Sequence, residues 1–209
     1  MNKVLLVVRH GETAESRNQT IQGQADTVLT SRGIKQAEAL GHYLAAKHDI
    51  SQLICSDLLR ARQTADAVLA VMNGKVRIET EPSLREISCG KLEGMPLELL
   101  LKKRAECPLG AENYAPINGE SLSDLRTRVW NWVRSLTSGL TGEILVITHR
   151  GPISMILEYA SPILQNKQMR FAMEHNTISV FDFRCAGSVE LRGFERVPEI
   201  GSRADVQRD

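Results

Sequence analysis

The chain has almost no net charge and no long hydrophobic run. Its formal net charge is +1 at pH 7, so it has no overall field that would gather nucleic acid or an acidic membrane surface. Its first apolar run, Val4 to Val8, is followed at once by Arg9-His10 and is too short for a secretory signal or a membrane span. We therefore expect no nucleic-acid partner, no membrane partner and a cytoplasmic location.

Cysteine is scarce, and the few cysteines are far apart. Cys55, Cys89, Cys107 and Cys185 include no C-x-x-C pair and no ladder of close spacings. This pattern predicts neither a disulfide framework nor a zinc site. We expect buried or half-buried free thiols in a reducing compartment.

No repeat, low-complexity tract or linker divides the 209 residues. A composition of 42% hydrophobic and 24% charged residues fits one globular domain with a sizeable core. Residues 195–209 are polar, have no apolar period and are expected to fray. The sequence therefore predicts one domain over residues 1–194 and a polar C-terminal tail over 195–209.

Short apolar or alternating runs predict the strands. These runs are Val4–Val8, Leu53–Cys55, Val76–Thr80, Ile144–Ile147, Thr177–Phe183 and Val189–Phe194. The runs at Val4–Val8 and Ile144–Ile147 are continuously apolar, which is typical of strands buried on both faces of a largely parallel sheet. Val76–Thr80 alternates and is expected to be more exposed.

Helical patterns lie between these strands. Thr30 can cap a helix that has Ile34, Ala37, Leu40 and Leu44 on its apolar side. Ser56-Asp57 can cap a second helix, whose apolar side contains Ala61, Ala65, Val68, Leu69 and Met72. Further helices are expected at Leu97–Arg104, after a capping box from Ser121 to Asp124, and through Met155, Ile156 and Tyr159. The alternation predicts an α/β fold, a three-layer α/β/α sandwich with a mostly parallel mixed sheet and helices on both faces. Ligands of such folds bind at the carboxyl ends of the parallel strands.

Two of the apolar strands end in a histidine that is followed closely by glycine. His10 precedes Gly11, and His149 precedes Gly151 by two residues. A lone histidine is more often a hydrogen-bonded structural residue or a metal ligand. Because parallel strands end at the same edge of a sheet, the matched placement favours one pocket that holds both imidazoles.

Two arginines add positive charge at related places. Arg9 lies beside the first histidine, and Arg60 lies in the first turns of the helix after the second strand. Guanidinium groups bind phosphate oxygens through two parallel hydrogen bonds. Arginine on a helix is usually solvated or paired with a carboxylate, and that interpretation is kept for Arg62 and Arg85.

A set of ordered motifs resembles a known family. The motifs are Leu6–Thr13, Ile21–Gly23, Leu29–Gly33, Ser56–Ala65, Leu84–Ile87 running to Leu92–Gly94, Gly119–Ser121 and Thr148–His149. Together they resemble the signature of the histidine phosphatase superfamily, the phosphoglycerate-mutase-like group, from about Lys3 to Phe183. The resemblance makes residues 1–194 a single catalytic domain of this type.

The resemblance implies a role for each matching residue. His10 would attack phosphorus and become a phosphohistidine, which splits one difficult displacement into two easier ones. Arg9, Arg60 and His149 would bind the equatorial phosphoryl oxygens, and Glu86 would protonate the leaving group. The loop at Gln22 and Gly23 would line the same pocket, and neither a metal nor a cofactor is expected.

The sequence departs from the family pattern at two positions. Ser16 stands where the family commonly has an asparagine that contacts phosphate, and a serine hydroxyl has a shorter reach. Arg150 replaces the glycine that commonly follows the second histidine, and its side chain can bind a second anionic group. Both residues are expected to bind substrate, and both bear on substrate choice more than on chemistry.

Several functions fit this pattern. The segment between Gly94 and Gly119 is modest, which resembles the compact phosphatase branch and favours a metal-independent phosphomonoesterase acting on small phosphorylated metabolites. A phosphoglycerate mutase primed by 2,3-bisphosphoglycerate and a non-catalytic phospholigand-binding module are the alternatives. A metal hydrolase is least favoured because the neighbouring arginines oppose a cation. The sequence leaves the substrate and the oligomeric state open.

Overall fold

The computed structural model describes residues 3–72, 76–136, 142–161, 172–183 and 189–198, so Cys185 and residues 199–209 of the expected tail lie outside it. The elements in chain order are β1 (Lys3–Arg9), α1 (Ala14–Arg17), α2 (Ser31–Lys47), β2 (Ile50–Cys55), α3 (Leu59–Val71), β3 (Ile78–Thr80), η1 (Pro82–Leu84), η2 (Gly90–Leu92), α4 (Leu97–Ala105), α5 (Leu122–Ser135), β4 (Glu143–Thr148), α6 (Arg150–Ala160), β5 (Thr177–Phe183) and β6 (Val189–Arg196). None of the helices in these ranges has the length and apolar character needed to cross a membrane.

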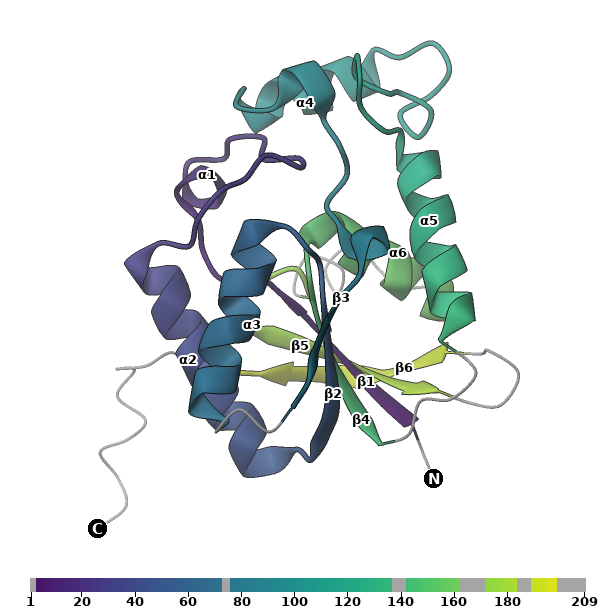
Figure 1. Cartoon of the computed structure of the whole chain (residues 1–209). Coiled ribbons are helices and arrows are strands. Elements are labelled where there is room, and N and C mark those ends of the chain that lie inside the picture. Colours follow the sequence, from purple (N-terminus) through teal and green to yellow (C-terminus); the bar gives the residue numbers. More distant parts are fainter. Residues whose placement is uncertain (1–2, 73–75, 137–141, 162–171, 184–188, 199–209) are drawn as a thin grey trace.

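The strands form one mixed sheet in the order β3-β2-β4-β1-β5-β6. Neighbours from β3 to β1 pair in parallel, whereas β5 pairs antiparallel with β1 and β6 pairs antiparallel with β5. Helices α2 and α3 cover one face and α5 and α6 cover the other, as Figure 1 shows. The predicted three-layer sandwich with a mostly parallel sheet is confirmed.

The central strand β1 contributes side chains to the cores on both faces of the sheet. Leu5 and Val7 belong to the core beneath α5 and α6, and Val4, Leu6 and Val8 belong to the core beneath α2 and α3. Successive side chains of a strand point to opposite faces. A strand covered on both faces therefore has an unbroken apolar sequence, as predicted.

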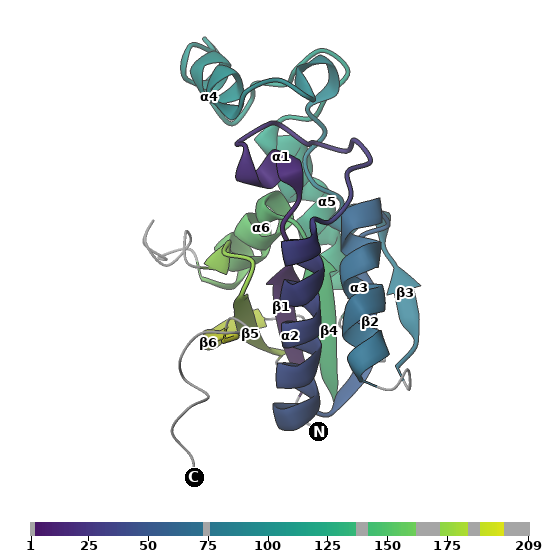
Figure 2. The same ribbon diagram turned by 90° about the vertical axis from the view of Figure 1, so that its left-hand side faces the viewer.

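The two histidines of the strand ends come to one edge of the sheet. In the parallel pairing of β1 with β4, Arg9 is the partner of Thr148, so His10 and His149 both follow the last paired residues. The amide of His10 also donates to the Thr148 carbonyl at 2.9 Å. Figure 2 shows α1 and α4 beyond this edge, where they cover the ends of the parallel strands.

Helix α2 packs through three of the four apolar residues predicted for its buried side, Ala37, Leu40 and Leu44, and through two glycines. Ile34 is 44% exposed, which corrects its expected place in the core. Gly33 and Gly41 are buried instead, and a Cβ at Gly33 would lie 2.2 Å from the carbonyl oxygen of Glu12. The helix thus approaches the loop after β1 more closely than a side chain at this position would allow.

The predicted capping box of α5 is confirmed, but the predicted caps of α3 are wrong. Ser121 accepts from the Asp124 amide and its own amide donates to Asp124. Helix α3 begins after Leu58, which makes no side-chain cap. Ser56 Oγ instead contacts His149 Nε2 at 2.9 Å and accepts from the Leu58 amide at 3.3 Å, and the Asp57 carboxylate accepts from Arg85 Nε at 2.7 Å.

The fold extends past the predicted start of the tail at residue 195. Strand β6 continues to Arg196, and Val197 is buried with its amide donating to the Asn176 carbonyl at 2.8 Å. The Glu195 carboxylate contacts His48 Nε2 at 3.0 Å and accepts from the Tyr43 hydroxyl at 3.0 Å. These contacts explain why residues 195–197 belong to the fold despite their polar sequence.

Candidate active site

A cleft of about 810 Å³ opens at the carboxyl ends of the parallel strands. Eight of the nine predicted site residues line it: Arg9, His10, Ser16, Gln22, Gly23, Arg60, Glu86 and Arg150. The ninth, His149, is fully buried beneath the cleft, with its ring centroid 5.0 Å from that of His10. Residues from five separate motifs are therefore brought to one place.

The His10 ring is held in a defined orientation and tautomer. Its Nδ1 lies 2.7 Å from the Gly11 carbonyl oxygen, which can only accept, so Nδ1 carries the proton of the neutral ring. Burial is the largest of the causes that hold the pKa of His10 well below 6.5, and the neighbouring His149 ring and the charge of Arg9 act in the same direction. At neutral pH, His10 therefore has an unprotonated Nε2 with a free lone pair.

A second histidine is held by one donor and one acceptor. The Nε of Arg60 donates to Nδ1 of His149 at 3.2 Å, so the proton of the neutral ring lies on Nε2, which is 2.9 Å from Ser56 Oγ. Burial first, and then the charges of Arg60 and Arg9, hold the pKa of His149 well below 6.5. Both ring nitrogens thus have protein partners.

Arg60 is a buried cation whose guanidinium also organises the loop around it. NH2 donates to the Gly23 carbonyl at 2.8 Å, and NH1 donates to the Ala25 carbonyl at 2.9 Å and to Thr27 Oγ1 at 3.2 Å. Burial lowers the pKa of Arg60, and the charge of Glu86 opposes this shift. Within the described part of the chain, Arg60 is therefore neither solvated nor paired with a carboxylate, unlike most arginines on helices.

Arg9 has a guanidinium nitrogen without a protein partner. Its NH1 donates to the Met173 carbonyl at 3.1 Å, whereas Nε is buried and forms no hydrogen bond with the described residues. Burial lowers the pKa of Arg9 to about 10, while Glu86 raises it. Arg9 therefore remains charged at neutral pH and has a donor available for an anion in the cleft.

The Glu86 carboxylate lies at the N-terminal end of α6. Its Oε1 accepts from the Gly151 amide at 3.1 Å and from the Ile87 amide at 2.9 Å. A Cβ at Gly151 would lie 2.2 Å from the same Oε1, so only glycine leaves room for this carboxylate. The position of Glu86 thus explains why residue 151, two positions after His149, is a glycine.

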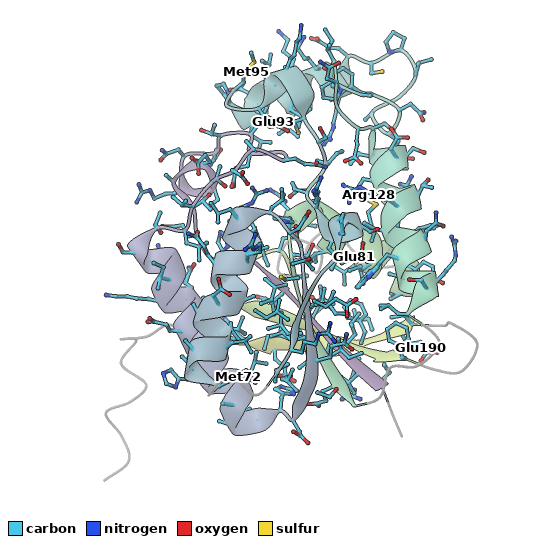
Figure 3. All side chains as sticks on the ribbon, in the orientation of Figure 1. Met72, Glu81, Glu93, Met95, Arg128 and Glu190 are labelled. Carbon is cyan, nitrogen blue, oxygen red and sulfur yellow. The ribbon has the colours of Figure 1, made fainter. Side chains whose placement is uncertain are left out.

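The loop that carries Glu86 is held by Arg128 on α5, a residue that no motif indicated. In Figure 3, Arg128 lies between α5 and this loop. Its guanidinium donates to the carbonyls of Ser83, Arg85 and Glu86 at 2.8, 2.9 and 3.0 Å. The Glu120 carboxylate pairs with the same guanidinium at 2.8 Å. Three hydrogen bonds from Arg128 therefore fix the backbone around Glu86, and the ion pair with Glu120 holds Arg128 in place.

Gln22 and Gly23 belong to a further loop that lines the cleft. Gln22 Oε1 accepts from the hydroxyls of Thr13 and Thr27 at 3.1 and 2.7 Å. Gly23 has a φ of 51°, and a Cβ there would lie 2.1 Å from Glu93 Oε1. Gly23 offers its carbonyl to Arg60, so its expected role as a backbone donor stays a prediction.

The two departures from the family pattern have different environments. The Ser16 hydroxyl donates to the Thr13 carbonyl at 2.9 Å and accepts from the Thr13 amide at 3.0 Å, as part of the capping box of α1. Its proton is thus directed away from the cleft, which weakens the expected phosphate contact. Arg150 is exposed at the mouth of the cleft, with Nε 3.2 Å from Met173 Sδ.

Two further residues of the site had no signal in the sequence. His175 donates from Nδ1 to the His10 carbonyl at 2.5 Å, and burial first and Arg9 second lower its pKa to about 4. Glu15 lines the cleft with an Oε2 that is buried and unpartnered among the described residues. The residues that the structure describes contain no group of three or more His, Cys, Asp or Glu side chains placed to hold a metal ion.

Comparisons with known proteins give the family. The chain matches the model of the histidine phosphatase superfamily (branch 1) over residues 5–193. Phosphoglycerate mutase-like protein 4 of Arabidopsis thaliana is 32% identical over 184 residues, which cover 85% of this chain and 80% of that protein. Fructose-2,6-bisphosphatase TIGAR B of Danio rerio is 36% identical over 135 residues, which cover 63% of this chain and 52% of that protein.

The chain therefore spans about half the length of the Danio rerio relative. Among solved structures, the phosphoglycerate mutase from Bacillus anthracis str. Sterne has the same fold, with a TM-score of 0.77, 23% identity and 92% of each chain covered. The resemblance stated from the motifs is confirmed, and the chain belongs to the histidine phosphatase superfamily.

Proposed function

We propose that the chain is a metal-independent phosphomonoesterase that hydrolyses small phosphorylated metabolites through a phosphohistidine on His10. The observation that carries this proposal is the neutral His10 ring, whose Nδ1–H is given to the Gly11 carbonyl at 2.7 Å beside the half-buried cation Arg9 and the buried cation Arg60. A free imidazole lone pair next to fixed positive charge suits attack on an anionic phosphorus centre.

In the first step, Nε2 of His10 attacks phosphorus, and the bond between phosphorus and the ester oxygen breaks. The Glu86 carboxyl group gives its proton to the departing alkoxide, which is a poor leaving group until it is protonated. In the second step, the Glu86 carboxylate takes a proton from water, and the resulting hydroxide attacks the phosphohistidine. The P–N bond breaks, inorganic phosphate leaves, and His10 returns to its neutral form.

Arg9, Arg60 and His149 would stabilise the three equatorial phosphoryl oxygens. Arg9 Nε has no partner among the described residues, and four hydrogen bonds use four of the five N–H groups of Arg60. Both arginines thus keep a donor for phosphate. His149 has partners on both nitrogens, so its contribution requires its Ser56 contact to be exchanged for phosphate.

A phosphotransfer reaction is the second candidate, because the Arabidopsis thaliana relative is named as phosphoglycerate mutase-like. The same phosphohistidine would then pass its phosphoryl group to a hydroxyl other than water. Isomerisation of 3-phosphoglycerate without release of phosphate, in the presence of 2,3-bisphosphoglycerate, is the result that would favour it.

The decisive experiment combines a substrate screen with trapping of the intermediate. Purified protein is incubated with phosphorylated metabolites in the presence of a chelator, with phosphoglycerates and sugar phosphates first in the panel because of the names of the two relatives. We expect phosphate release and an acid-labile phosphoryl group on the wild type. His10→Ala is expected to lose both, and Glu86→Gln is expected to be slowed about 10²-fold or more on alkyl esters.

Three results would contradict the proposal. Hydrolysis unimpaired in both variants would show that the site is elsewhere. Binding of phosphorylated ligands without any phosphohistidine would favour a non-catalytic module. Activity that is abolished by the chelator and restored by zinc would favour a metal hydrolase.

A further inference from the structure

We propose that Arg104 binds a second anionic group of the substrate, a carboxylate or a second phosphate, remote from the phosphoryl group at His10. The inference rests on the proposed phosphatase function, since Arg104 and His10 line the same cleft. It narrows the substrate class to esters whose alcohol portion carries a negative charge.

The guanidinium of Arg104 has buried donors without acceptors. Its Nε and NH2 are closed off from solvent and form no hydrogen bond with any described residue. Its neighbours on α4, Lys102 and Lys103, are exposed, so Arg104 differs from the basic residues that commonly end a helix in solvent. Buried polar groups are almost always paired, and a charged one without a partner is costly.

The anions near Arg104 are not available to it. Burial is the main cause that raises the pKa of the Cys89 thiol to about 12, so that thiol is uncharged at neutral pH. The Glu86 carboxylate accepts from the amides of Ile87 and Gly151. Glu15, the other carboxylate of the cleft, has its own buried oxygen without a partner. Among the residues that the structure describes, no acceptor is therefore left for these donors of Arg104, and a ligand can supply one.

Helix α4 is held rigidly over the cleft, so Arg104 is a preorganised donor. The Leu97 amide donates to the Gln19 carbonyl at 2.9 Å, and the Ile21 amide donates to the Met95 carbonyl at 2.8 Å. Figure 1 shows α4 beside the segment around α1, to which these bonds join it. The same hydrogen bonds that shape the loop before Gln22 therefore place α4 and its last turn.

The remaining lining of the cleft suits a carbon skeleton. Beside the charged groups, the cleft is lined by the apolar side chains of Ile21, Ile87, Leu97, Leu100, Leu122 and Leu125. Arg9, Arg60 and Arg150 supply positive charge at the strand ends around His10, and Arg104 supplies it from α4. This arrangement fits a molecule with an anionic group on each side of an uncharged portion.

The test compares esters that differ only in the second charge. We would measure kcat/KM for ω-phosphonooxy alkanoates of graded chain length, for the bisphosphates of the matching diols and for the plain alkyl phosphates of equal length. We expect the wild type to prefer one anionic series over the alkyl phosphates by at least about tenfold, because a buried donor set rejects ligands that leave it unpaired. The preferred series identifies carboxylate or phosphate as the second group.

The variants separate recognition from structure. Arg104→Ala is expected to bring this ratio close to one, Arg104→Lys to give an intermediate ratio, and the exposed Lys103→Ala to leave it unchanged. A wild type that hydrolyses all series equally, or an Arg104→Ala variant that keeps the preference, would overturn the proposal while the phosphatase function stands. If no ester is hydrolysed, the proposed function fails, and Arg104 is then judged by the same ratio in binding constants measured calorimetrically.

Discussion

Nε of Arg60 lies 3.2 Å from Nδ1 of His149, in the buried floor beneath the cleft. A guanidinium group only donates, so this contact requires a neutral His149 with its proton on Nε2. Arg60 thereby orients the second histidine as well as supplying charge. Because the same guanidinium also binds the carbonyls of Gly23 and Ala25, one side chain joins His149 to the loop that contains Gln22 and Gly23.

Arg60→Lys tests this arrangement. Lysine keeps the charge but has no planar fork, so it cannot reach His149, Gly23 and Ala25 together. We expect the free energy of unfolding to fall by about 2 kcal/mol or more, since several buried charge-assisted hydrogen bonds are lost. We also expect kcat/KM to fall by about 10²-fold or more. Urea denaturation and steady-state kinetics measure the two effects.

The matched control is Arg62→Lys, which changes an exposed arginine of the same helix. It should leave both the stability and kcat/KM close to the wild type. Equal effects of Arg60→Lys and Arg62→Lys would contradict the organising role of Arg60.

The stability of the fold should decrease as the pH falls below about 6.5. The pKa values of His10, His149 and His175 are all lowered in the folded protein, to about 4 for His175, mainly by burial. The unfolded chain takes up protons on these rings near pH 6.5, and the folded chain does not. The unfolded state thus binds more protons in this range, and the free energy of unfolding should fall by up to about 1.4 kcal/mol per pH unit for each histidine.

Urea denaturation between about pH 5 and pH 8 measures this slope. His175→Gln keeps a donor for the His10 carbonyl. It should reduce the pH dependence of the free energy of unfolding by the contribution of one histidine. His42→Gln, which changes an exposed residue of α2, should leave it unchanged. A stability that does not vary between about pH 5 and pH 6.5 would show that these rings titrate normally in the folded state.

The position of the two histidines at one edge of the sheet could be predicted, because the apolar runs before them show where each strand ends. His10 and His149 follow unbroken apolar runs, and the parallel pairing of Arg9 with Thr148 then brings the two rings together. Ser56 gave the wrong signal: it precedes a helix and was expected to cap it, yet it contacts His149 at 2.9 Å. Its role depends on which strand lies beside β2, which no local pattern contains.

Arg128 could not be predicted for a related reason. It lies on an ordinary amphipathic helix, and its three carbonyl acceptors precede it in the sequence by 42 to 45 residues. Arg104 likewise follows two lysines at the end of a short helix, as many solvated arginines do. Only the packing of α5 and α4 against the loops of the cleft distinguishes these arginines from surface residues.

Arg128→Ala should lower kcat while it changes KM little. The variant removes the donors to the Ser83, Arg85 and Glu86 carbonyls, so Glu86 loses its fixed position although it remains in place chemically. We expect a reduction in kcat of about tenfold to 10²-fold, within the contribution of a positioned general acid. Steady-state kinetics on an alkyl phosphate measure the effect.

Arg126→Ala serves as the control for Arg128→Ala. Arg126 is on the same helix and as little exposed, but it pairs with Glu112 and Glu158 away from the Glu86 loop. It should change stability without changing kcat. A similar loss of kcat in both variants would assign the effect to α5 as a whole.

Gly151→Ala should act on the proton donor alone. The added Cβ would lie 2.2 Å from Glu86 Oε1, so the carboxylate has to move away from α6. We expect kcat/KM on alkyl phosphates to fall by about 10²-fold or more, as in Glu86→Gln. On p-nitrophenyl phosphate, whose leaving group is stable as an anion, the loss should be small, because His10 and the arginines are untouched. Gly193→Ala, which meets no atom within 4 Å, should leave both substrates unaffected. An equal loss on both esters would mean that Glu86 positions the phosphate rather than protonating the leaving group.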